Sequence, residues 1–337
     1  MTVKRGFDVP VLLVIYNRPK VTKESLAAIA KIEPKVLLVA ADGPRSAAES
    51  DQCSRTRDLI GGVNWECDIR TRFSDENLGC GVSVHTAVDW ALAQFEEIIV
   101  LEDDCIAEPS FFRFCEELLQ RYRHDGRIAH IGGFNFQETQ PVGKYSYFFS
   151  KYSIASGGWA TWRRAWKYYD WKIEHWPELK DAGLVQRWCD DRLEQKMWTS
   201  IYDRMHEGAP DVWDYQWNLA CWVQNGLAIL PSVHLLTNIG FGPDATHTKK
   251  VIPCLVAPTS KLSTISHPPF IVRNRKADAY LFEHNFGGAG MRYAKSWRGR
   301  LTYARQSLRS PCRAFKGLRG FLTYSRRSVS PGSDPKS

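Results

Sequence analysis

The chain has 337 residues, of which 44% are hydrophobic, 12% aromatic and 24% charged. This composition excludes a disordered or fibrous protein, and the length allows a large core and as many as two domains. The net charge of +8 is unevenly placed: residues 291–337 contain twelve Lys and Arg and one acidic residue, a sum of +11, which leaves −3 for residues 1–290. The body of the chain is therefore slightly acidic.

The nine cysteines form no Cys-x-x-Cys pair, and their number is odd. Neither a zinc knuckle nor a secreted disulfide framework is indicated. The apolar run 9–16 is short, contains Pro10 and is followed by Asn17 and Arg18, so it lacks the pattern of a signal peptide. No apolar run has the length needed to span a bilayer. We expect a reduced, cytoplasmic protein.

Apolar runs alternate with helical periodicity over the first 130 residues, which is typical of a mostly parallel sheet covered by helices. The apolar runs predict strands at residues 9–16, 36–41, 98–101 and 128–131, and residues 68–73 are a plausible further strand. The fold class is therefore predicted to be α/β.

Three helices are predicted between these strands. The first is expected to be capped by Thr22 and to end near Lys31. The second carries an apolar stripe from Val84 to Phe95 at helical spacing, and the third begins at Pro109.

The alternation of strands and helices ends after Phe136, and the chain becomes rich in Trp, Tyr, Gly and Arg. This composition favours a loop-rich half that closes over a ligand. We therefore expect a first domain at 1–250, with a nucleotide-binding half at 8–135 and an acceptor half at 136–250. A C-terminal extension at 251–290 and a basic, partly disordered tail at 291–337 would follow.

An acidic cluster follows the predicted strand 98–101. Glu102, Asp103 and Asp104 stand where open α/β sheets bind their ligands, at the carboxyl end of a buried strand. Adjacent carboxylates repel each other unless a cation or hydrogen bonds compensate, and hard oxygen ligands suit magnesium or manganese. The alternative is a solvated acidic turn.

Other polar residues occupy the same edge of the predicted sheet. Asn17 and Arg18 follow the first strand, Asp42 follows the second, and Asn77 precedes a helix. Together with the acidic cluster, these residues resemble nucleotide-sugar-dependent glycosyltransferases of the GT-A fold. The chain resembles the bacterial family-two-like sugar transferases and, more distantly, N-acetylglucosaminyltransferase I, which has the same Glu-Asp-Asp. The resemblance covers residues 8–250.

The resemblance implies a Rossmann-like sheet and a manganese or magnesium ion on the donor diphosphate. It assigns Asp104 as the direct metal ligand, with Asp103 and Glu102 toward the ribose and the waters of the metal. A histidine late in the chain contacts the metal or diphosphate in many GT-A enzymes, and His247 has that place in the order of the chain. A plain polar contact is the alternative for His247.

The resemblance also implies nucleotide contacts for Asn17, Arg18, Asp42 and Asn77. In this family the first-strand loop contacts the nucleotide, and the position of Asp42 reads the edge of the base. The alternatives are a solvated arginine for Arg18 and an ordinary Asp-Gly turn for Asp42.

A tryptophan-rich segment supplies candidate sugar contacts. Gly158 allows close approach of a ligand to the backbone, and Trp159 and Trp162 are candidates for stacking on a sugar. The bacterial relatives more often have Trp-Gly-Trp where this chain has Gly157-Gly158-Trp159. The alternative is a core formed by Trp159, Trp162 and Trp166.

The segment that begins at Asp211 is similar to the Trp-Asp-Asp stretch that supplies the base in the N-acetylglucosaminyltransferase I group. An inverting transfer needs a carboxylate that takes the proton of the acceptor hydroxyl. Asp214 is the candidate, with Asp211 as its replacement and Trp213 as an acceptor contact. Alternatively, Asp214 caps a helix that contains Trp217.

These residues predict a metal-dependent, inverting glycosyltransferase of hexosyl or N-acetylhexosaminyl type. The expected donor is a nucleoside-diphosphate sugar, with a UDP-sugar as first choice, and the expected acceptor is a glycan or lipid-linked hydroxyl in cell-envelope synthesis. A non-catalytic binding protein would have no use for the acidic cluster beside Asp214. A nucleotidyltransferase should have a Gly-rich first loop with Arg and Lys, which Asn17-Arg18-Pro19 lacks.

The basic tail is expected to contact an anionic membrane surface. Its cations alternate with aromatic residues, a pattern that suits a membrane interface or a nucleic-acid strand. Because the acceptor is expected at the cell envelope, we predict peripheral contact at the inner face of the membrane, with nucleic acid as the less favoured partner.

Overall fold

The computed structural model describes residues 6–137, 144–155, 157–208, 211–242 and 251–297. They fall into two compact units: the described residues up to 240 and those of 252–278 form the first, and residues 241–242, 251 and 279–297 belong to the second. The second unit includes α11 (Gly288–Lys295). α10 (Arg275–His284) begins in the first unit and ends in the second. The expected boundary at residue 250 does not coincide with this division.

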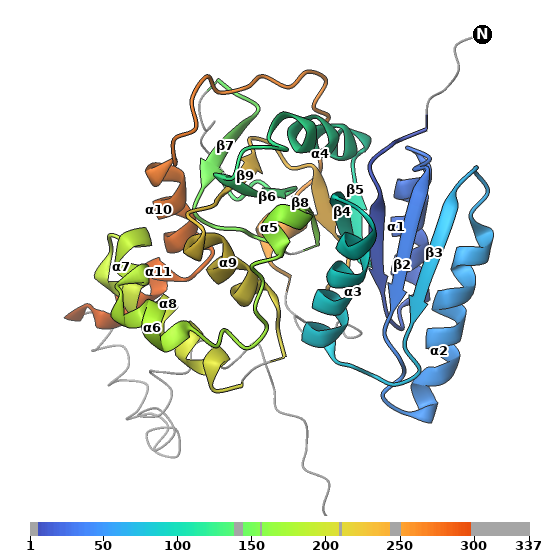
Figure 1. Cartoon of the computed structure of the whole chain (residues 1–337), viewed down its shortest axis with the longest axis horizontal. Coiled ribbons are helices and arrows are strands. Elements are labelled where there is room, and N and C mark those ends of the chain that lie inside the picture. The colour runs from blue at the N-terminus through green and yellow to red at the C-terminus, as the bar shows by residue number, and fades with distance from the viewer. Residues whose placement is uncertain (1–5, 138–143, 156, 209–210, 243–250, 298–337) are drawn as a thin grey trace, which may run out of the picture. The chain divides into compact units, whose positions relative to one another are not determined.

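An eight-stranded sheet forms the centre of the first unit (Figure 1). Its order is β3-β2-β1-β4-β8-β6-β9-β7. The strands are β1 (Val11–Ile15), β2 (Val36–Ala41), β3 (Asp68–Phe73), β4 (Glu97–Glu102), β6 (Ile128–Gly132), β7 (Tyr147–Ser150), β8 (Gly158–Trp162) and β9 (Leu227–Pro231). Only β8 and β7 run against the other six strands of this described sheet. The predicted α/β class with a mostly parallel sheet is confirmed.

Nine helices accompany the described sheet in the first unit. They are α1 (Pro19–Ala30), α2 (Ala47–Asp58), α3 (Cys80–Gln94), α4 (Pro109–Arg121), α5 (Arg163–Trp166), α6 (Trp176–Asp181), α7 (Leu184–Trp188), α8 (Arg192–His206) and α9 (Asp214–Val223). Two 3₁₀ turns, η1 (Leu59–Gly62) and η2 (Pro253–Leu255), and a two-stranded sheet of β5 (Cys105–Ala107) and β10 (Leu236–Asn238) complete the elements of this unit. The half after Phe136 is thus more regular than predicted. None of the described helices is long and apolar enough to cross a membrane.

The first helix begins earlier than predicted. It starts at Pro19, and Thr22 lies inside its first turn, where its hydroxyl donates to the Arg18 carbonyl at 2.8 Å. Proline is favoured at the first helical position for two reasons. Its fixed φ suits a helix, and an N–H at this position would have no partner within the helix, so its absence costs nothing. Thr22 is therefore not the cap.

The register brings the ends of three strands to one edge. β1 pairs in parallel with β2, Ile15 opposite Ala41, and with β4, Val14 opposite Glu102. The order β3-β2-β1-β4 is the order found in half of a doubly wound nucleotide-binding sheet, whose ligands lie at the carboxyl ends of the strands. The polar residues that follow β1, β2 and β4 are therefore neighbours.

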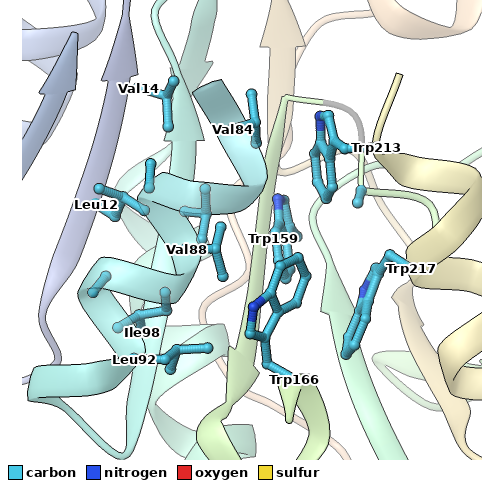
Figure 2. Close-up of a cluster of buried hydrophobic side chains, with 14 of the residues drawn as sticks. Leu12, Val14, Val84, Val88, Leu92, Ile98, Trp159, Trp166, Trp213 and Trp217 are labelled. Carbon is cyan, nitrogen blue, oxygen red and sulfur yellow. The ribbon is translucent and has the colours of Figure 1, made fainter. Parts of the chain in front are cut away.

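The hydrophobic core fixes this arrangement from one face of the sheet (Figure 2). The predicted stripe of α3, including Val84 and Val88, lies in one buried cluster with Leu12 and Ile98 of the central strands. Trp159 of β8 and the indoles of α5 and α9 extend the same cluster. Apolar burial of this kind contributes about 25 cal/mol per Å², so it holds the strand ends in place at the edge of the sheet.

Candidate active site

Arg18 lies between the two aspartates that follow β4 and binds both of them. Its Nη2 donates to Asp103 Oδ1 and to Asp104 Oδ2, the latter at 3.0 Å, and its Nε donates to Asp103 Oδ2 at 3.4 Å. Only 17% of the Arg18 side chain is exposed, against 5% for Asp103 and 12% for Asp104. The loop after β1 is therefore joined to the end of β4 by a shielded ion pair, which compensates the buried charges.

Burial raises the pKa of two carboxyls in the acidic cluster. Burial and then the charge of Asp104 raise the pKa of Glu102 to about 8, although the Gly157 N–H donates to Glu102 Oε1 at 3.0 Å. Burial raises the pKa of Asp103 to about 6, while Arg18 acts to lower it. The raised pKa favours the protonated form of Glu102. Asp103 and Asp104 carry two negative charges against the single positive charge of Arg18.

Segments distant in sequence hold the acidic cluster. Asn238 of β10 donates from Nδ2 to Asp104 Oδ1 at 3.0 Å, and a Cβ on Gly240 would lie 2.0 Å from Asp104 Oδ2. Ser25 of α1 donates to the Asp103 carbonyl at 2.8 Å. Neither Asn238 nor Ser25 is predicted from the sequence, although the Gly-rich segment that begins at Asn238 marks a close approach of backbone.

The acidic cluster fits a magnesium or manganese ion that is shared with a diphosphate. Its donors are carboxylate oxygens, which these hard cations prefer. Within the described ranges, no group of three or more His, Cys, Asp or Glu side chains is arranged as a complete metal site. Magnesium is usually bound by one or two carboxylates, with substrate phosphates and water as its other ligands. Asp103 and Asp104 could supply the protein's share.

A pH-dependent stability is expected from Glu102 in the presence of chelator. Its pKa in the folded chain is about 8 and its ordinary value is 4.5, so the folded state holds the proton more tightly. The stabilisation is complete below pH 4.5 and is lost as pH rises toward 8. We expect the melting temperature of wild type to fall relative to that of Glu102→Gln between pH 5 and 8, by at least about 2–4 °C. If the melting temperatures of the two proteins change with pH in the same way over this range, the raised pKa of Glu102 is contradicted.

Asp42 holds the loop between β3 and α3. Its Oδ1 accepts from the N–H groups of Gly43 at 2.9 Å and Leu78 at 2.8 Å, and its Oδ2 accepts from Asn77 Nδ2 at 2.9 Å. Asp42 and Asn77 therefore bind each other. The contacts of Asp42 and Asn77 with a base or ribose remain a prediction. The same holds for the nucleotide contact of Asn17, which is partly buried in the turn after β1.

Tyr16 and Glu49 are additional polar residues near this edge. The Tyr16 hydroxyl donates to Glu49 Oε2, and the Arg45 guanidinium carbon lies 5.5 Å from the centre of the Tyr16 ring. An aromatic ring beside a cation could contact a nucleotide. Tyr16 is the last residue of the first apolar run in the sequence, so the sequence pattern did not mark it as a candidate site residue.

Asp214 is the first residue of α9 and is partly buried. Burial raises the pKa of its carboxyl, and the backbone N–H groups of Asp214 and Tyr215 act to lower it. The helix cap is Trp213, without a side-chain capping bond, so the alternative role of Asp214 as a cap is not what the structure shows.

Asp211 has a different position from Asp214. Its carboxylate accepts hydrogen bonds from the N–H groups of Cys80 at 2.8 Å and Gly81 at 2.7 Å, the first residues of α3. Burial first, and then the charges of Glu102, Asp211, Asp214 and Asp42 in that order, raise the pKa of the Cys80 thiol. Asp211 therefore lies against the start of α3, and Asp214 follows three residues later at the start of α9.

The tryptophan predictions require correction. Trp159 is 0% exposed, Trp162 1% and Trp213 5%, so these rings belong to the core and do not offer a face to a sugar. Residues three apart in a strand point to opposite faces. Trp159 accordingly packs against Trp213 in the α3 layer, whereas Trp162 Nε1 donates to the Leu119 carbonyl of α4. Gly158 is also buried, with a Cβ position 2.4 Å from the side chain of Leu236.

Two predictions lie outside the described residues. His247 belongs to the range 243–250, and the basic tail is described only as far as Trp297. The metal contact of His247 and the membrane contact of the tail remain predictions.

No known family model matches the chain, and no curated protein matches it. Similar solved structures include residues 1–349 of TarS from S. aureus, with 13% identity, a TM-score of 0.38, and coverage of 66% of this chain and 58% of that one. A putative nucleotide-diphospho-sugar transferase from Desulfovibrio desulfuricans G20 has 8% identity, a TM-score of 0.33 and coverage of 67% and 80%. UDP-glucose pyrophosphorylase in its apo form has 10% identity, a TM-score of 0.35 and coverage of 66% and 90%.

The chain spans less than two thirds of the TarS structure. Structural similarities as weak as these do not assign a function to this chain. The strand order of the chain itself shows an α/β fold with a mostly parallel sheet. The Rossmann-type order β3-β2-β1-β4 continues into the antiparallel β8, and the acidic cluster follows β4.

Proposed function

We propose that the protein transfers a sugar from a nucleoside-diphosphate sugar to a hydroxyl of a glycan or lipid-linked acceptor, with inversion and with a divalent cation. The observation that carries this proposal is the position of Asp103 and Asp104, which follow β4 and bind Arg18 of the loop after β1. The edge formed by the ends of β1, β2 and β4 suits the nucleotide.

In this proposal Asp214 is the general base. Its carboxylate takes the proton of the acceptor hydroxyl while that oxygen forms a bond to the anomeric carbon. The bond from the anomeric carbon to the diphosphate oxygen breaks, and the diphosphate leaves with the electron pair. A carboxylate with a raised pKa is a stronger base at neutral pH than an ordinary aspartate, provided that it remains ionised.

The charge of the acidic cluster supports a divalent cation. Asp103 and Asp104 carry two negative charges and Arg18 carries one positive charge, a sum of −1. A donor diphosphate would meet net repulsion there, and a cation of charge +2 would change the sum to +1. When bound, the cation would supply positive charge to the diphosphate.

A panel of nucleotide sugars tests the proposed function. Each donor is added to the full chain with manganese or with chelator, and the melting temperature is measured. A ligand at 100 times its Kd stabilises the native state by about 2.7 kcal/mol. One nucleotide sugar should stabilise the protein with manganese much more than with chelator, and nucleoside diphosphate should be released when acceptor is present. The proposal fails if no nucleotide sugar stabilises the protein.

The basic tail is expected to bind anionic membrane, where a lipid-linked acceptor would be found. Each Lys or Arg near such a surface contributes about 1 kcal/mol, and the segment after Gly290 contains twelve. The full chain should float with anionic vesicles and not with neutral ones. A chain that ends at Gly290 should remain in solution and still bind donor nucleotide. Equal flotation of both chains would contradict this role, and steeply salt-dependent binding to DNA instead of vesicles would indicate nucleic acid.

A further inference from the structure

The Asp211 carboxylate joins two segments that are 130 residues apart in sequence. Its Oδ2 accepts from the Cys80 N–H at 2.8 Å and its Oδ1 from the Gly81 N–H at 2.7 Å. These N–H groups belong to the first turn of α3, where helical donors have no partner within the helix. Asp211 thus supplies a long-range cap to a helix whose own preceding residue, Gly79, provides no side-chain cap.

Glycines make room for this contact on both sides. Gly79 has a φ of +80°, and a Cβ there would lie 2.6 Å from Asp211 Oδ2. A Cβ on Gly81 would lie 2.8 Å from Asp211 Oδ1 and 2.4 Å from the ring of Trp171. Larger side chains at either position would displace Asp211, so the fit of its carboxylate depends on the glycines.

The same helix start is fixed from the other direction by Asp42. Asp42 binds the Leu78 N–H and the Asn77 amide, which precede Gly79. Asp42 therefore holds the loop before Gly79, and Asp211 holds the helical turn after it. Asp214 stands three residues further along the chain, at the start of α9.

We infer that Asp211 is a positioning residue, which fastens the segment carrying Asp214 to the first turn of α3 and so sets the distance of Asp214 from the end of β4. The inference rests on the proposed function, in which Asp214 is the base. It also reverses the sequence-based expectation that Asp211 could replace Asp214. Both carboxylate oxygens of Asp211 already bind backbone donors, which suits an anchor.

The chain offers a matched control at another helix. Asp191 accepts from the N–H groups of Leu193 at 2.8 Å and Glu194 at 3.0 Å at the start of α8. Asp191→Asn therefore alters the same chemistry at a helix that carries none of the proposed catalytic residues. It should change the melting temperature and leave kcat at the wild-type value.

The test measures kcat, donor KM and the pH profile for Asp211→Ala, Asp211→Asn, Asp214→Asn and the Asp191→Asn control. Misplacement of a reacting group by about 1 Å can cost about 100-fold in rate. We expect Asp211→Ala to lower kcat by about 10- to 100-fold with donor KM little changed. Asp211→Asn should recover part of this loss, because its amide oxygen can still accept one N–H. Both Asp211 variants should keep the fall in rate at low pH, and Asp214→Asn should lose it.

Two kinetic outcomes would overturn the inference. If Asp211→Asn loses the low-pH fall in rate and is as inactive as Asp214→Asn, Asp211 is itself the base. If Asp211→Ala has wild-type kcat, the contact only stabilises the fold.

Amide hydrogen exchange measures the anchoring role of Asp211 without any transfer assay. A failure of this role can therefore be distinguished from a failure of the proposed function. In Asp211→Ala, the amides of Cys80, Gly81 and Asp214 should exchange faster than in wild type. The amides at the start of α8 should be unchanged. Equal exchange at Asp214 in wild type and variant would show that Asp211 does not fasten this segment.

Discussion

Replacing Asp214 with Asn is expected to lower turnover by about two to four orders of magnitude, the usual contribution of a general base. The amide has nearly the same shape and cannot take the proton of the acceptor hydroxyl. Donor affinity should change little, because the base faces the acceptor. Steady-state kinetics with the donor identified by thermal stabilisation, together with donor titration, would measure both quantities.

The pH dependence of turnover checks the same assignment. The base must be ionised, so the rate should fall as pH drops through the pKa of Asp214. Burial raises that pKa, and the midpoint should therefore lie above the ordinary aspartate value of about 3.9. Asp214 lies at the first position of α9 and not at the cap, and burial disfavours its ionised form, so Asn should cost at most about 1 kcal/mol of stability at neutral pH. A stable and fully active variant would remove Asp214 from the mechanism.

The affinity for a nucleoside diphosphate is expected to fall by at least about 100-fold when manganese is replaced by chelator. Two unit charges 4 Å apart interact by about 4 kcal/mol at an effective dielectric constant of 20, and 100-fold corresponds to about 2.7 kcal/mol. The difference arises because Asp103 and Asp104 outweigh Arg18 when no other cation is present. Titration calorimetry with each cation and with chelator would measure it.

Asp104→Asn should remove most of this dependence on metal. The variant keeps the size of the side chain near Gly240 and Asn238 and loses one negative charge. Its affinity in chelator should therefore equal or exceed that of wild type, while its affinity with manganese should be lower. Equal wild-type affinity with and without cation would show that Arg18 alone compensates the acidic cluster.

Local sequence patterns predicted much of the central sheet. The ranges predicted for β2 (Val36–Ala41) and β3 (Asp68–Phe73) coincide with the observed strands, because turn residues bound both runs. The start of α1 was predicted wrongly because Thr22 was taken as the cap. Pro19 is the stronger signal, since proline is favoured at the first helical position. α5 (Arg163–Trp166), at four residues, is too short to show a helical period.

The positions of candidate residues in the fold were predictable where the order of the chain decides them, and they were not predictable where tertiary contacts decide them. Asp104 could be placed at the edge of the sheet, because a buried strand leads directly to it. The pairing of Arg18 with both aspartates depends on the parallel register of β1 and β4. The contact of Asp211 with α3 spans 130 residues and leaves no local pattern. Trp159 and Trp162 were misjudged because aromatic residues are equally suited to a core and to a sugar site.

A crystal structure of the full chain with manganese and the nucleoside diphosphate that stabilises it most would test the central claim directly. Anomalous scattering at the manganese edge locates the metal independently of the nucleotide. We predict a manganese peak beside Asp104, with the diphosphate on the metal and the nucleoside toward Asn17 and Asp42. A nucleotide bound away from the ends of β1, β2 and β4, or a manganese peak remote from the acidic cluster, would contradict a nucleotide-sugar site at this edge.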